Sequence, residues 1–288
     1  MKRLVLIDGH AILHRAFHAL PLNIKFNAVY GFTTMLLRIL TDLKPDYLAV
    51  AFDLPQPTFR QQQYTQYQAK RPEMQGNLAE QIPLVHEMLE ALEIPYFELA
   101  GYEADDMIGT MATQNKGETI IVTGDRDMLQ LVNSHVKVCV PVKGLAETKI
   151  YDEKQIAEEF GVKPSQWVDV KALKGDASDN YPGVRGIGPK TAQDLIVEYI
   201  TIEGLYKNLK KLEAKTAKKL AEGAEDAGMG KKLAKIVTDA PIHLDLDKAD
   251  VSGINWNSGI KYMREKLGFK SIPERIEKEY LDKQMKLV

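Results

Sequence analysis

The sequence predicts an α/β fold in which a parallel-rich central sheet carries helices on both faces. Apolar runs of strand length occupy residues 3–7, 47–52 and 119–123, and patterns with a helical period lie between them. An aspartate follows each run within two residues. Buried strands that alternate with helices are typical of parallel sheets covered on both sides.

The chain opens with the first unit of this sheet. Residues 3–7 read Arg-Leu-Val-Leu-Ile, which is the apolar stretch of a buried strand. Asp8 follows, and a helical pattern of apolar residues then covers 11–17. A second helical pattern, at 30–40, leads to the next strand.

The second and third strands also end at acidic side chains. Asp53 follows the second run, and Asp125 and Asp127 follow the third, just before helical signals at 128–131. Open parallel sheets bind ligands beyond the carboxyl ends of their strands. We therefore expect these aspartates to converge with Asp8 at one edge of the sheet.

A further acidic group lies between these strands, where residues 101–106 read Gly-Tyr-Glu-Ala-Asp-Asp. Glu103 and Asp106 would share one face of the helix that begins here, with Asp105 beside them. Two unit charges ~4 Å apart repel by roughly 4 kcal/mol at an effective dielectric constant of about 20. Taken alone, the group is also explained by helix capping and the helix dipole. Together with the acids at the strand ends, it predicts a site for cations.

The donor set indicates which cations bind. Mg²⁺ and Mn²⁺ prefer carboxylate and water oxygens, whereas zinc prefers Cys and His, which do not cluster in this sequence. The acids outnumber the needs of one ion, so we expect two Mg²⁺ ions, replaceable by Mn²⁺, that activate a water and stabilise the leaving oxygen of a phosphodiester. Asp176 and Asp179 are candidates to complete the second site.

The segment at 55–92 interleaves aromatic and cationic side chains. It contains Arg60, Tyr67, Lys70 and Arg71, and its pattern becomes helical from residue 82. Aromatic rings stack on bases and cations pair with phosphates, so this composition indicates contact with a single strand of nucleic acid. A glutamine-rich surface segment without that role is the alternative.

The second half of the chain reads as mainly helical, beginning with a helix at 151–160 and including a loop at 223–230. Its most informative run, residues 186–191, reads Gly-Ile-Gly-Pro-Lys-Thr and resembles a helix-hairpin-helix motif. Glycines allow close backbone approach, and free N–H groups at a helix start bind phosphate. The expected contacts with the backbone of duplex DNA come from Gly186, Gly188, Lys190 and Thr191.

Composition sets the general class of protein. A chain of 288 residues that is 44% hydrophobic can bury a large core. The net charge of -2 argues against nucleic-acid binding only when taken alone, because acids that hold metals lower the sum without removing a basic groove. The first apolar run is too short for a signal peptide and no run reaches membrane length, so we expect a cytoplasmic protein. The single cysteine, Cys139, excludes an internal disulfide and fits a reducing compartment. We expect Cys139, Trp256, Tyr262 and Phe269 to be packing residues.

A series of motifs, in order over roughly residues 2–275, resembles the 5′-nuclease domain of bacterial DNA polymerase I, a member of the flap endonuclease family. The motifs are Asp8-Gly-His-x4-Arg15-Ala-Phe, Tyr30-Gly-Phe-Thr, Val50-Ala-Phe-Asp53, Pro57-Thr-Phe-Arg60, Arg71-Pro-Glu-Met, Gly101-Tyr-Glu-Ala-Asp-Asp106, Thr123-Gly-Asp-Arg-Asp127 and Gly175-Asp-x-Ser-Asp179-Asn-x-Pro-Gly-Val. The resemblance implies a PIN-like 5′-nuclease fold with a helical arch beside the 5′ strand, and a K⁺ ion at the helix-hairpin-helix.

The resemblance also implies roles for individual residues. Metal ligands would be Asp8, Asp53, Glu103, Asp105, Asp106, Asp125, Asp127, Asp176 and Asp179. DNA contacts would come from His14, Arg15, Tyr30, Arg60, Tyr67, Lys70 and Arg71, in addition to the hairpin residues.

Two positions depart from the pattern of the family. His14 stands where a stacking Tyr is usual, and Gln68 stands where the arch usually has a lysine. If the arch is helical, positions 68 and 70 point ~200° apart, whereas Arg71 lies near the face of Gln68. We therefore expect Arg71 to supply most of the catalytic positive charge and Lys70 to contact the passing strand.

These observations predict a structure-specific, metal-dependent 5′-3′ exonuclease and flap endonuclease, which the resemblance associates with primer removal and repair. Its partner would be branched DNA with a 5′ single strand, and it would work as a monomer, away from membranes and alongside a DNA polymerase. Residues 1–165 would form the nuclease core, with the arch at about 55–92, and residues 166–288 a helical region packed on it. A branched-DNA-binding module with attenuated cleavage and a PIN-type ribonuclease are the alternatives.

Overall fold

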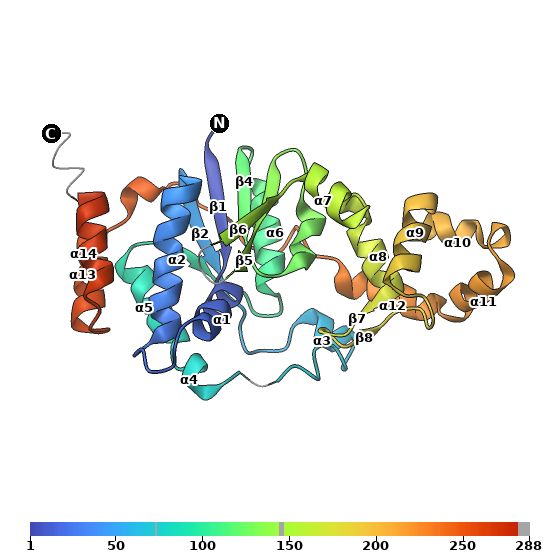
Figure 1. Ribbon diagram of the computed structural model, residues 1–288, viewed down its shortest axis with the longest axis horizontal. Helices are drawn as coiled ribbons and strands as arrows, with labels where there is room; N and C mark the ends of the chain where they lie inside the picture. The colour runs from blue at the N-terminus through green and yellow to red at the C-terminus, as the bar shows by residue number, and fades with distance from the viewer. Residues whose placement is uncertain (73, 144–146, 282–288) are drawn as a thin grey trace.

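A six-stranded sheet forms the centre of the protein, in a computed structural model that describes residues 1–72, 74–143 and 147–281 (Figure 1). The strands lie in the order β3 (Tyr96–Phe97), β2 (Tyr47–Ala51), β1 (Arg3–Asp8), β4 (Glu118–Val122), β5 (Val136–Lys143) and β6 (Glu147–Tyr151). All neighbouring strands are parallel except β5 and β6. The predicted parallel-rich sheet is confirmed.

The register of the central strands brings their carboxyl ends to one level. Asp8 lies beside Ala51 of β2, and Ile7 lies beside Val122 of β4. Side chains alternate between the faces of β1, so that Val5 and Ile7 join one apolar cluster and Leu4 and Leu6 join the other. Burial on both faces explains why this strand is a continuous apolar run.

Helices cover both faces of the sheet, as predicted. On one face lie α1 (Gly9–Ala19), α2 (Asn27–Leu43), α5 (Ile82–Ala91), α13 (Trp256–Glu265) and α14 (Ser271–Ile276). On the other lie α6 (Ala104–Gln114), α7 (Glu153–Phe160) and a 3₁₀ helix at Arg126–Leu131. Trp256, Phe269 and Cys139 are buried, which confirms their packing role.

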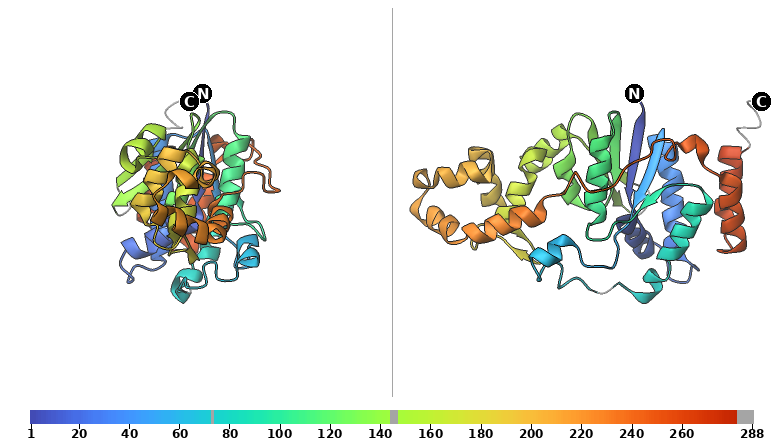
Figure 2. Two further views of the ribbon diagram at one scale, coloured as in Figure 1. Left: turned by 90° about the vertical axis from the view of Figure 1, so that its right-hand side faces the viewer. Right: turned by 180° about the vertical axis from the view of Figure 1, so that it is seen from behind.

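A helical lobe with its own apolar cluster extends from one end of the sheet (Figure 1). It consists of α8 (Trp167–Lys174), the hairpin β7 (Gly175–Asp176) and β8 (Tyr181–Pro182), α9 (Pro189–Tyr199), α10 (Ile202–Lys207), α11 (Ala214–Glu222) and α12 (Ala224–Ala234). After α12 the chain returns along the back of the core to α13 and α14 at the opposite end (Figure 2). The region predicted as one C-terminal helical part is therefore divided between the lobe and the core.

Two expectations for the sheet and the lobe are wrong. Tyr151, predicted to begin a helix, ends strand β6 instead, and the helix α7 begins at Glu153. Residues 147–150 are exposed, so this edge strand lacks the apolar run that marks a buried strand. The expected loop at 223–230 is mostly helix α12, in which a Cβ on Gly230 would lie 3.1 Å from the Ala172 carbonyl oxygen of α8. This glycine permits close helix packing and does not mark a turn.

The arch is only partly helical. Short helices α3 (Phe59–Gln63) and α4 (Gly76–Ala79) flank turns at 65–70. Gln68 has a φ of 56°, which interrupts a right-handed helix, and Pro72 disfavours helical geometry at the residue before it. The helix assumed for positions 68–71 is therefore absent. Within the described parts of the chain, no helix is long and apolar enough to cross a membrane.

Candidate active site

Acidic side chains surround a cavity of about 610 Å³ at the carboxyl ends of β1, β2 and β4. The acids that line it are Asp8, Asp53, Glu103, Asp105, Asp125, Asp127 and Asp179. The structure thus brings together strand-end acids, acids of the 101–106 group and one acid of the lobe. Residues of the arch, including Gln68 and Arg71, also line the cavity.

Local structure fixes the acids that follow the strands. Asp8 caps helix α1, because its Oδ1 accepts a hydrogen bond from the Ala11 N–H at 2.9 Å, and its Oδ2 accepts one from Thr123 Oγ1 at 2.7 Å. Asp53 Oδ1 accepts a hydrogen bond at 2.7 Å from the Ala104 N–H, at the start of α6. Asp125 caps the following 3₁₀ helix by accepting from the Asp127 N–H at 2.7 Å.

Burial makes this cluster electrostatically costly. It raises the pKa of Asp8 to about 7, with Asp53 adding to the effect, and it raises the pKa of Glu103 to about 7. Burial, followed by the charges of Asp125 and Asp8, raises the pKa of Asp105 well above its usual value. Asp105 lines the cavity, and its carboxylate accepts no hydrogen bond from another described residue.

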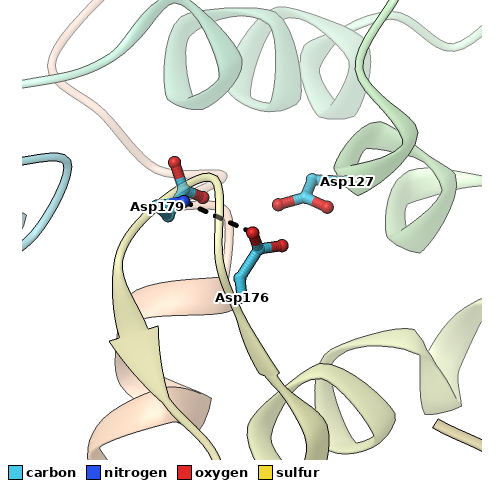
Figure 3. A group of neighbouring side chains, drawn as sticks. All are labelled: Asp127, Asp176 and Asp179. Atoms are coloured by element: carbon cyan, nitrogen blue, oxygen red, sulfur yellow. Dashed lines mark hydrogen bonds between the residues drawn. The ribbon is translucent and has the colours of Figure 1, made fainter. Parts of the chain in front are cut away.

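The lobe contributes a second acidic group beside the first (Figure 3). One carboxylate oxygen each of Asp127, Asp176 and Asp179 lies within 4.8 Å of the others. Lys171 of α8 pairs with Asp127 and, at 2.6 Å, with Asp176. Burial raises the pKa of Asp127 to about 6, and Asp125 adds to this shift. We call Asp127, Asp176 and Asp179 the second acid trio.

The two acidic groups fit hard divalent cations. Each offers several carboxylate oxygens, and the described lining residues include no cysteine. The expectation that histidines do not cluster is wrong, because His10, His14 and His18 of α1 also line the cavity. Crowded buried carboxylates also need positive charge to stay ionised together. Asp8, Asp53, Glu103, Asp105 and Asp125 would hold one ion, and the second acid trio would hold another.

Asp106 and Arg60 do not have the predicted roles. The Arg60 guanidinium donates to Asp106 Oδ2 at 2.7 Å and to Asp106 Oδ1 at 2.8 Å, and the two residues are 2% and 0% exposed. Asp106 also accepts hydrogen bonds from the N–H groups of Val237 and Glu103. The assignment of Asp106 to a metal and of Arg60 to DNA is therefore wrong, because both are consumed in a buried, bidentate ion pair.

The arch residues differ in their access to the cavity. Tyr67 was expected to stack on a base, but it is 4% exposed, and its ring stacks on Tyr181 with centroids 6.5 Å apart. Gln68 Nε2 and Arg71 Nη2 both donate to Asp179 Oδ1, at 3.2 and 3.3 Å. Lys70 is exposed and does not line the cavity. Gln68 and Arg71 thus reach one carboxylate through a turn, without the helix assumed for them.

Of the other expected DNA contacts in the described chain, only His14 lines the cavity. Arg15 is half-buried on α1, and Tyr30 packs against Phe269 with centroids 5.2 Å apart. Tyr30 therefore belongs to the packing of α2 against the C-terminal helices. Residues 186–191 lead into α9, which begins at Pro189 and lies in the lobe (Figure 1).

Sequence reasoning missed Lys171 and Tyr181. Lys171 lies five residues before Asp176, where the helical pattern alone gave no reason to turn it toward the acids. Tyr181 is 3% exposed, and its hydroxyl has no hydrogen-bond partner in the described structure. The available signal for Tyr181 was its position two residues after Asp179, a predicted metal ligand.

Comparison with known proteins places these features in a family context. The model of the 5′-3′ exonuclease N-terminal resolvase-like domain matches residues 3–161, and that of the 5′-3′ exonuclease C-terminal SAM fold matches residues 162–257. DNA polymerase I of Bacillus caldotenax is 42% identical over 285 residues, which cover 96% of this chain and 32% of that protein. The chain thus spans about a third of the length of the curated relatives it matches.

Solved structures share the fold. The bacteriophage T5 D15 flap endonuclease, in a complex with DNA and metal ions, has a TM-score of 0.68 at 19% identity and covers 98% of each chain. The catalytic core of Rad2 in complex with DNA substrate has a TM-score of 0.61 at 18% identity, covering 96% of this chain and 90% of that one. At these identities the likeness concerns the fold alone.

Proposed function

We propose that this chain, which belongs to the 5′-3′ exonuclease family, hydrolyses phosphodiesters at the 5′ ends and 5′ flaps of branched DNA. The observation that carries this proposal is the cavity in which buried acids face the arch. A single strand that enters this cavity brings its phosphates next to the candidate metal ligands. We place this activity in primer removal and repair, alongside a polymerase in the cytoplasm, because the similar proteins are named DNA polymerase I.

The acids described above suit two Mg²⁺ ions, and Mn²⁺ offers the same preference for oxygen. When bound, two such ions supply an activated water and stabilise the charge on the leaving oxygen. The protein contributes position and charge. The strand ends hold one set of carboxylates, the lobe holds the other, and Arg71 adds a cation beside the path of the phosphate.

The lobe would hold the duplex part of the substrate. Helix α9 begins at Pro189 after Gly188, and no side chain caps its free N–H groups. These groups, together with the exposed Lys190 and with Thr191, suit the phosphate backbone, which is the same for every base sequence. Gly186 has a φ of 80° and its carbonyl oxygen accepts a hydrogen bond from Lys219 Nζ at 2.9 Å. We extend the proposal to a K⁺ ion at this hairpin and to a monomeric enzyme.

The direct test is cleavage of a 5′-labelled flap and of a blunt duplex, each with and without Mg²⁺. The proposal predicts Mg²⁺-dependent release of the flap strand and slower action on the blunt duplex. Binding of the flap without cleavage in either Mg²⁺ or Mn²⁺ would favour the DNA-binding module instead. Preferential cleavage of single-stranded RNA would favour a ribonuclease.

Arg71→Ala should lower the single-turnover cleavage rate by about 100-fold, because a cation near a phosphate stabilises the charge that develops in the transition state. Lys70→Ala is the matched control, since Lys70 is the neighbouring cation but is exposed and outside the cavity. Its rate should stay within about threefold of wild type, with the change confined to DNA affinity. Equal losses of rate in the two variants would contradict the role assigned to Arg71.

A further inference from the structure

The arch segment, defined here as residues 64–72, is docked on the loop between β7 and β8. The Gln68 N–H donates to the Asp179 carbonyl oxygen at 2.8 Å, and Asn180 Nδ2 donates to the Gln66 carbonyl oxygen at 2.6 Å. Gln68 and Asn180 both have a φ of 56°. Left-handed backbone costs free energy for residues with a side chain, so these facing turns persist because the contacts between them hold them.

The same docking uses the Asp179 carboxylate. Its Oδ1 atom accepts hydrogen bonds from Gln68 Nε2 and from Arg71 Nη2, and Asp179 is 8% exposed. Asp179 also belongs to the second acid trio, so one buried carboxylate serves both the arch and the candidate cation site. Gln68 binds Asp179 without adding a positive charge.

The charges around the second acid trio indicate how a bound cation would affect the docked arch segment. The three carboxylates of the trio face two protein cations, Lys171 and Arg71, which leaves one net negative charge. Glu103 and Asp125, which line the same cavity, add further negative charge, so a divalent cation would act on the trio by competing with its protein cations for the carboxylate oxygens. The Arg71 side chain is 54% exposed and the Lys171 side chain 5%, so Arg71 can regain water at the lower cost.

We propose that Gln68 and Asn180 are positioning residues that keep the arch segment docked on Asp179, and that a divalent cation entering the second acid trio undocks it. Undocking frees Arg71 for a phosphate of the DNA strand. The inference rests on the proposed function for the identity of that strand, but the competition for Asp179 does not require DNA. By linkage, docking weakens cation binding by the same factor by which the cation weakens docking.

Hydrogen–deuterium exchange of the arch segment, measured on the full chain without DNA, tests the competition directly. The Gln68 amide reports on docking, because its acceptor is the Asp179 carbonyl oxygen. Addition of Mn²⁺ should raise exchange at this amide by about 2- to 10-fold, the range that corresponds to the net free energy of one hydrogen bond. Unchanged or slower exchange of the arch segment at saturating Mn²⁺ would overturn the proposal.

A second measurement follows the opposite direction of the linkage. Asn180→Gly removes the hydrogen bond to Gln66 while keeping a backbone that accepts positive φ. Calorimetric titration with Mn²⁺ should show about 2- to 10-fold tighter binding at the weaker site than in wild type. Gln68→Gly should act in the same direction, and Thr65→Ala, an exposed residue of the same segment, should match wild type.

Failure of this inference is distinguishable from failure of the proposed function. Equal Mn²⁺ affinity in Asn180→Gly and wild type would refute the docking competition even if flap cleavage is normal. Loss of cleavage in wild type would refute the function even if exchange responds to Mn²⁺. The circular dichroism melting curve of each variant identifies one that does not fold, and the other glycine variant then carries the test.

Discussion

Asp105→Asn should lower the single-turnover cleavage rate by about 1,000-fold, the size expected when several kcal/mol of transition-state stabilisation are lost. The Asp105 carboxylate lines the cavity, and no donor of the described chain neutralises it. Burial and the charges of Asp125 and Asp8 raise its pKa, so a bound cation would stabilise its ionised form. Quenched-flow cleavage of a labelled flap in Mg²⁺ measures the effect.

The same variant should not be less stable than wild type. Replacing a crowded carboxylate by a neutral amide removes repulsion and breaks no hydrogen bond in the described structure. Urea unfolding without divalent cations should therefore give an equal or higher unfolding free energy. A large loss of stability, or a cleavage rate within tenfold of wild type, would show that Asp105 has a structural role.

Asp106→Asn, the identical chemical change one residue further along, should lower the free energy of unfolding by about 3–5 kcal/mol. It removes the bidentate partner of Arg60, which is 2% exposed and joins α3 to α6, and leaves the guanidinium, among the described carboxylates, only its contact with Glu103 Oε2 at 3.0 Å. Arg60 also donates to the Leu233 and Lys235 carbonyl oxygens, so the pair connects the arch and the end of α12 to the core. Urea unfolding curves of the two asparagine variants provide a matched comparison.

A double-mutant cycle separates pairing from packing at this position. Arg60→Met and Asp106→Leu should each be about as damaging as Asp106→Asn, because each leaves a buried charge without its bidentate partner. The double variant with Asp106→Leu should recover part of the loss, since an apolar pair needs no compensation. Additive losses in the double variant would show that the ion pair is not the source of the effect.

Much of the site follows from the sequence because a parallel sheet has simple geometry. Asp8, Asp53 and Asp125 each come after a buried apolar run, and the register of β1 with β2 and β4 makes them neighbours. The separate roles of Asp105 and Asp106 could not be read in the same way. They depend on Arg60, which is distant in sequence and reaches only one of the two.

The remaining errors come from tertiary contacts that local patterns do not encode. The arch departs from a helix because Gln68 adopts a positive φ while docked on Asp179. Lys171 faces the acids because α8 packs against α12, where Gly230 allows close approach. An aromatic such as Tyr67 in a cationic segment predicts base stacking, yet its ring is buried against Tyr181.

The most direct test of the account is an anomalous-difference map of crystals of this protein soaked in Mn²⁺. Two peaks about 4 Å apart are expected. One should contact Asp105 and the strand-end acids, the other should contact the second acid trio, and neither should contact Asp106. A single peak remote from the cavity, or a peak bound by Asp106 in place of Arg60, would contradict the assignment of this cavity as the catalytic centre.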